Sequence, residues 1–96
     1  MFVGVARYEL HLLTKPGSLK EKRAVVRRLR DRIRSRVQIA AAEVADQDLH
    51  HRAVLAVACV SADQATARAL LEAADQVVSS TPEVEVLERH VEVDPW

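Results

Sequence analysis

Cysteine, aromatic residues and long apolar runs are all scarce in this 96-residue chain, and each scarcity excludes a class of protein. The single cysteine, Cys59, excludes an intrachain disulfide and a zinc site built from several cysteines. No apolar run approaches the roughly 20 residues that a transmembrane helix needs. The first ten residues lack the basic start and the small-residue cleavage site of a signal peptide. We therefore expect a cytoplasmic protein with no membrane segment.

Signatures of catalysis and of metal or cofactor binding are missing as well. The chain has no phosphate-binding loop ending in Gly-Lys-Ser/Thr, no His-Glu-x-x-His motif and no Gly-x-Ser-x-Gly motif. His50 and His51 follow Asp46 and Asp48, but adjacent histidines point in different directions and a metal site needs a third convergent ligand. We therefore expect a non-enzymatic protein without a metal or cofactor.

Positive charge is distributed unevenly, although the formal net charge is zero. Residues 15–36 contain ten Lys or Arg residues and only two acids, Glu21 and Asp31, which is a local balance of +8. The rest of the chain holds four Arg residues and twelve acids, a balance of −8. The basic segment is therefore the part of the chain that would contact a polyanion.

Hydrophobic periodicity predicts a strand and then a helix in the first part of the chain. Residues 2–13 alternate with the period of a strand, and residues 14–17 (TKPG) are typical of a turn. The face of this strand predicted to be buried carries Phe2, Ala6, Tyr8, Leu10 and Leu12. Ser18 and Glu21 form a capping box at the start of a helix over about 19–35. Its apolar stripe consists of Leu19, Val25, Val26, Leu29 and Ile33.

Two strands are predicted next. Residues 37–46 are extended, and the polar residues 46–51 form a turn. Residues 52–61 (RAVLAVACVS) are nearly all apolar, which is typical of a central strand buried on both faces.

The remaining residues complete the fold. Ser61 and Gln64 repeat the capping-box pattern and predict a second helix over about 62–79, before a last, acidic strand over 84–93. With right-handed crossovers, the order βαββαβ gives a single ferredoxin-like α+β domain over 1–96. Its four-stranded antiparallel sheet would carry both helices on one face.

This fold leaves the second face of the sheet without helices. The strand over 52–61 is apolar on both faces, and Val3 and Val5 lie on the second face of the first strand. One interpretation is scattered surface residues, which are common. The other is a contiguous contact surface of a small regulatory or assembly domain, which would form a homodimer or bind a protein partner.

The basic segment predicts a cationic stripe on the first helix. Spacings of three and four residues place its members on one face. The stripe consists of Lys20, Arg23, Arg27, Arg30 and Arg34, with Lys15 and Arg28 at its margins. Guanidinium groups in such a row can bind successive phosphates, which predicts an electrostatic, salt-sensitive RNA-binding surface.

RNA is preferred to DNA because the chain has no helix-turn-helix or zinc pattern, and RNA is often held through its backbone and shape. Base stacking on the sheet is excluded, since Phe2 and Tyr8 fall on the face predicted to be buried. A second interpretation remains open: the stripe is a solvated face neutralised by the chain's own acids, such as those of residues 84–93.

Lys22 lies near the middle of the apolar stripe of the same helix. Either its stem lies along apolar surface while its ammonium group reaches water, or it forms a buried pair with Glu43 or Asp46. We prefer the first interpretation.

Four segments together resemble the YlxP-like family of small bacterial proteins, a domain of unknown function. They are VGVARYELHL, SLKEKRAVVRRLRDRIR, AEVADQDLHHRAVLAVACVS and the acidic last strand. The resemblance covers almost the whole chain and implies a similar ferredoxin-like fold. The family's genes often neighbour those for translation initiation and ribosome maturation, and some members are labelled ribosome-binding-factor-like, so the resemblance implies a ribosome-associated role. The family has no established catalytic residues to carry over to this chain. His50 departs from the family pattern, in which Trp is common at this position.

Overall fold

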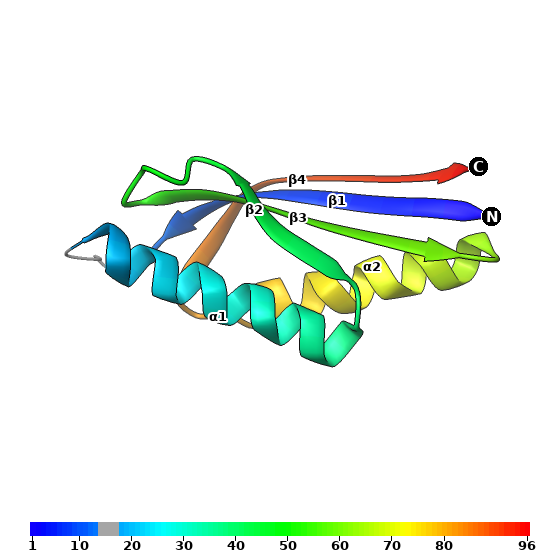
Figure 1. Cartoon of the computed structure of the whole chain (residues 1–96), viewed down its shortest axis with the longest axis horizontal. Helices are drawn as coiled ribbons and strands as arrows, with labels where there is room; N and C mark the ends of the chain where they lie inside the picture. Colours follow the sequence, from blue (N-terminus) through cyan, green and yellow to red (C-terminus); the bar gives the residue numbers. More distant parts are fainter. Residues whose placement is uncertain (14–17) are drawn as a thin grey trace.

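The computed structural model describes residues 1–13 and 18–96, so the predicted turn over 14–17 lies outside the described residues. Six elements follow one another: β1 (Phe2–Leu12), α1 (Leu19–Val37), β2 (Ala40–Ala45), β3 (Arg52–Ser61), α2 (Gln64–Ser79) and β4 (Val84–Pro95). The strands form one antiparallel sheet in the order β2-β3-β1-β4. Figure 1 shows both helices on the same face of this sheet. This is the predicted ferredoxin-like arrangement.

The start of α1 follows the capping chemistry of its sequence. The Ser18 side chain accepts a hydrogen bond from the Glu21 backbone N–H at 3.3 Å, which satisfies one of the helix's unpaired donors. The helix runs two residues further than predicted, to Val37, and ends at Gln38, whose positive φ of 60° turns the chain out of the helix. This later end delays β2, which begins at Ala40 instead of residue 37.

The predicted capping box of α2 is wrong. Asp63, not Ser61, is the N-cap, and its carboxylate accepts from both the backbone N–H of Thr66, at 2.7 Å, and the Thr66 hydroxyl. These hydrogen bonds lower the pKa of Asp63 because they stabilise its charged form. Ser61 ends β3, where its hydroxyl accepts from the Asp63 N–H. An ionised carboxylate is the stronger acceptor, and it sets the helix start at Gln64.

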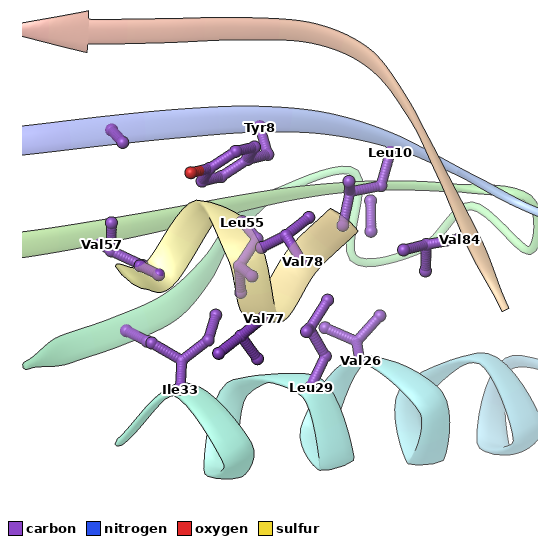
Figure 2. Close-up of a cluster of buried hydrophobic side chains, with 14 of the residues drawn as sticks. Tyr8, Leu10, Val26, Leu29, Ile33, Leu55, Val57, Val77, Val78 and Val84 are labelled. Atoms are coloured by element: carbon purple, nitrogen blue, oxygen red, sulfur yellow. The ribbon is translucent and has the colours of Figure 1, made fainter. Parts of the chain in front are cut away.

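The core lies between the helices and the sheet. Alternation along β1 buries Ala6, Tyr8, Leu10 and Leu12, as predicted. Phe2, predicted on the same face, is only partly buried against this core. From α1 the stripe of Val26, Leu29 and Ile33 points toward Leu55 of β3 and Val77 and Val78 of α2 (Figure 2). Both helices therefore bury one face against the same side of the sheet.

The prediction that β3 is buried on both faces is wrong. Leu55 and Val57, which face the helices, are buried, whereas Ala58 is exposed and Val60 is 64% exposed. Of the β3 residues that face away from the helices, only Val54 is buried. No helix of the described chain covers that side, which we call the open face. The small and β-branched residues of β3 suit a central strand, but they do not reveal which side is covered.

Candidate nucleic-acid interface

The two flanks of α1 meet different neighbours. On one flank, Arg34 donates a hydrogen bond to the backbone carbonyl of Ala41 in β2 at 2.7 Å. On the other flank, Arg28 pairs with Glu83 at 3.4 Å and Arg32 donates to the Thr81 hydroxyl at 3.1 Å, both in the connection between α2 and β4. The predicted cationic stripe therefore lies on the flank of α1 beside the edge strand β2. Arg28 lies on the opposite flank and is separated from the stripe. Lys15 lies outside the described residues.

Three arginines of the stripe line one depression between α1 and β2, which we call the α1–β2 hollow. Its lining residues are Arg23, Val26, Arg27, Arg30 and Glu43. Its volume of about 190 Å³ is smaller than the roughly 300–1,000 Å³ of pockets for drug-sized ligands. A hollow of this size with three guanidinium groups suits a phosphate group with part of its sugar.

Intramolecular acids neutralise this flank only in part. Arg30 pairs with its neighbour Asp31 at 2.9 Å, and Arg23 lies 3.8 Å from Asp48, whose side chain is 93% exposed, so that this pair is weak. Within residues 1–13 and 18–96, Arg27 and Lys20 have no ion-pair partner. Nor does any ion pair in this part of the chain join α1 to β4, the strand whose acids offered an alternative explanation of the stripe. Arg27 therefore presents an uncompensated charge at the centre of the flank.

Our preferred interpretation of Lys22, that its ammonium group reaches water, is wrong. The side chain is fully buried, and its Nζ donates to Glu43 Oε2, to the Asp46 carbonyl at 2.9 Å and to the Gln47 carbonyl at 3.4 Å. All three ammonium protons have acceptors because the chain turns at Asp46, where φ is 62°, and directs these carbonyls inward. The alternative, a buried pair with Glu43, is correct. It fixes the first turn of α1 to the end of β2 and so positions the α1–β2 hollow.

A second polar cluster, between α2 and β4, was not predicted. Asp75 accepts from the Tyr8 hydroxyl at 3.2 Å and pairs with Arg89 at 2.9 Å. Burial raises the pKa of Tyr8, Asp75 acts in the same direction, and Arg89 opposes both. A hollow of about 340 Å³ adjoins the cluster and includes Arg68. The residues of this cluster come from distant parts of the chain. The only local signal for it in the sequence was Asp75, a polar residue beside the apolar face of α2.

The open face has an apolar half and a charged half. Val5, Ala40, Ala56 and Ala58 line a hollow of about 380 Å³ on it. The same hollow is also lined by Arg7, His90 and Arg34, the last residue of the cationic stripe.

The charged half of the open face contains a pair of carboxyl groups from neighbouring strands. Glu9 of β1 lies opposite Glu88 of β4. A hydrogen bond with Glu88, together with the charge of that residue, raises the pKa of Glu9, and Arg7 and Arg52 oppose this rise. Each open-face half therefore differs in chemistry from the cationic flank of α1.

Among residues 1–13 and 18–96, no three His, Cys, Asp or Glu side chains converge where they could hold a metal ion. Neither α1 nor α2 is long and apolar enough to cross a membrane.

The thiol of Cys59 is buried and donates to the Ala67 carbonyl at 3.7 Å, and burial raises the pKa of this thiol.

Comparisons with known proteins agree with this fold and give no activity. The solution NMR structure of a de novo designed protein with ferredoxin fold, LFR1 1, is 14% identical, covers 100% of this chain and 91% of its own, and has a TM-score of 0.57. The uncharacterized protein YlxP of Bacillus subtilis (strain 168) is 31% identical over 83 residues, which are 86% of this chain and 89% of that protein. The model of the family described as "Protein of unknown function (DUF503)" matches residues 3–91. The chain therefore belongs to the DUF503 family.

Proposed function

We propose that this chain is a non-enzymatic, cytoplasmic RNA- or ribosome-associated module that binds the phosphate backbone through the flank of α1 beside β2. One observation carries the proposal: Arg23, Arg27 and Arg30 line a single hollow, and Arg27 forms no ion pair within residues 1–13 and 18–96. Guanidinium groups match phosphate oxygens bidentately, so a row of them favours a polyanion with regularly spaced phosphates.

RNA is the polyanion that the remaining features favour. The described elements include no recognition helix of the helix-turn-helix type, and a row of guanidinium groups suits the phosphate backbone rather than base edges. The gene neighbourhood of the YlxP-like family that the sequence resembles links the chain to translation or ribosome maturation. Binding of this kind is weakly sequence-selective and depends strongly on salt concentration.

Charge reversal on the α1 flank tests the proposal. We expect the variant Arg23→Glu/Arg27→Glu to bind a ribosomal RNA fragment about tenfold to a hundredfold more weakly at low salt, because two phosphate contacts are lost. The slope of log affinity against log salt concentration should become shallower by about 1.4 to 1.8. Fluorescence anisotropy over a salt series measures both quantities.

The matched control is Arg36→Glu/Arg68→Glu, which changes the net charge equally. Both arginines are exposed, and neither lines the α1–β2 hollow. This control should retain most of the affinity and the original slope. Equal losses in the two variants, or no loss in either, would contradict the α1 flank as the binding surface.

The open face supports a second candidate function, a regulatory or assembly domain that forms a homodimer through its sheet. The supporting observation is the hollow lined by Val5, Ala40, Ala56 and Ala58, because a contiguous exposed apolar patch usually marks a contact. Light scattering on the samples of the RNA experiment separates the two functions. This candidate requires a dimer with little RNA affinity, and a monomer at high protein concentration would contradict it.

A further inference from the structure

Building on the proposed phosphate contact, we propose that the α1–β2 hollow also recognises the 2′-hydroxyl of one ribonucleotide through Glu43, so that the chain prefers RNA to DNA of the same sequence. Glu43 is the one acidic residue among those that line this otherwise cationic hollow.

The two oxygens of the Glu43 carboxylate have different environments. Oε2 accepts from the buried Lys22 ammonium group, whose other protons go to the carbonyls of Asp46 and Gln47. No hydrogen bond within residues 1–13 and 18–96 uses Oε1. The side chain of Glu43 is 16% exposed and lines the hollow together with Arg23, Arg27 and Arg30. Glu43 therefore brings an available acceptor to a hollow whose other polar lining residues are all donors.

A ligand that satisfies this hollow must carry anionic oxygens and a hydrogen-bond donor close together. The oxygens would accept from the guanidinium groups, and the donor would go to Glu43 Oε1. A deoxyribose phosphate offers only the oxygens and would leave the carboxylate facing another anion. In RNA the 2′-hydroxyl lies next to the 3′-phosphate on the same sugar and supplies the donor. The Lys22 pairing lowers the electrostatic cost of a phosphate near Glu43, since the carboxylate already has a cation.

The size of the hollow agrees with a sugar and its phosphate. Its volume of about 190 Å³ leaves little space for a base as well. Val26 supplies apolar surface on which the sugar ring can rest. The bases would then point outward, and the preference for ribose would hold for any base sequence.

The test changes the ligand, because Glu43 also holds the buried Lys22 and a substitution there would alter the fold. Unstructured single strands of identical base sequence are compared as RNA, as DNA and as 2′-O-methyl RNA. Anisotropy at one fixed salt concentration should give RNA about tenfold tighter binding than the other two, since one hydrogen bond to a charged acceptor is lost. The salt slopes of all three should agree, because the phosphate contacts are the same.

The methylated strand separates the hydroxyl donor from sugar shape. It keeps an RNA-like sugar but has no 2′ donor, so binding as tight as that of RNA would overturn the role of Glu43. Equal affinity for RNA and DNA would also overturn it while leaving the phosphate contact intact. If none of the strands binds in a salt-dependent way, the proposed function itself fails and this inference fails with it.

Discussion

Replacing Lys22 with Met is expected to lower the free energy of unfolding by about 3–5 kcal/mol, which is the usual cost of removing one partner from a buried ion pair. The variant leaves the Glu43 carboxylate, which is 16% exposed, without its cation. It also leaves the carbonyls of Asp46 and Gln47 without their Lys22 donor. Because domains of this kind have about 5–15 kcal/mol of stability in total, this loss is a large fraction of it, and the urea midpoint should fall clearly. Urea unfolding followed by circular dichroism measures the loss.

Two further variants show whether the loss comes from the unpaired carboxylate. Lys22→Met/Glu43→Met removes both charges and should recover a large part of the stability, since apolar replacements of buried pairs are often neutral. Arg36→Met removes an exposed charge from the same helix and should change stability by less than about 0.5 kcal/mol. A loss below about 1 kcal/mol for Lys22→Met would show that Lys22 reaches water, as the sequence alone had suggested.

The second large effect concerns the two sides of β3. We expect Leu55→Ala to lower the free energy of unfolding by about 2–5 kcal/mol, because Leu55 is fully buried between the sheet and the helices and its truncation leaves a cavity. Val60→Ala on the open face is the matched control in the same strand. Val60 is 64% exposed, so its truncation should cost less than about 0.5 kcal/mol.

The same urea experiment measures both β3 variants. A similar loss for Val60→Ala and Leu55→Ala would show that the open face is covered in solution. That outcome would contradict the one-sided core and favour the homodimer.

Local periodicity, together with the right-handed crossover rule, was sufficient to predict the fold. Alternation along β1 and the apolar stripe of α1 depend on residues close together in the chain, and both correctly identified the core faces. The sides of β3 could not be distinguished, because apolar residues occupy both of its faces. The N-cap of α2 was predicted wrongly for a different reason. The Ser61–Gln64 spacing matches a capping box, but the path of the chain brings the Asp63 carboxylate, not the Ser61 hydroxyl, to the start of the helix.

The candidate site shows where such local patterns lose their predictive power. Helical spacing placed the cations of α1 on one stripe, but it could not identify the neighbours of each flank. That β2 lies beside Arg34 and that Glu83 lies beside Arg28 follows from strand order and crossover geometry. The partner of Lys22 depends on a backbone turn at Asp46, 24 residues away along the chain. Polar clusters assembled from distant elements leave little local signal.

The most direct test of the central claim is a map of the protein surface that RNA touches. Amide chemical shifts of the ¹⁵N-labelled chain would be followed by NMR during titration with a ribosomal RNA fragment. We predict shifts along α1 from Lys20 to Arg30 and at Glu43, with the Arg27 side-chain Nε signal among the largest. Val5 and Ala58 on the open face should not change. Shifts confined to the open face, with α1 unchanged, would contradict the account.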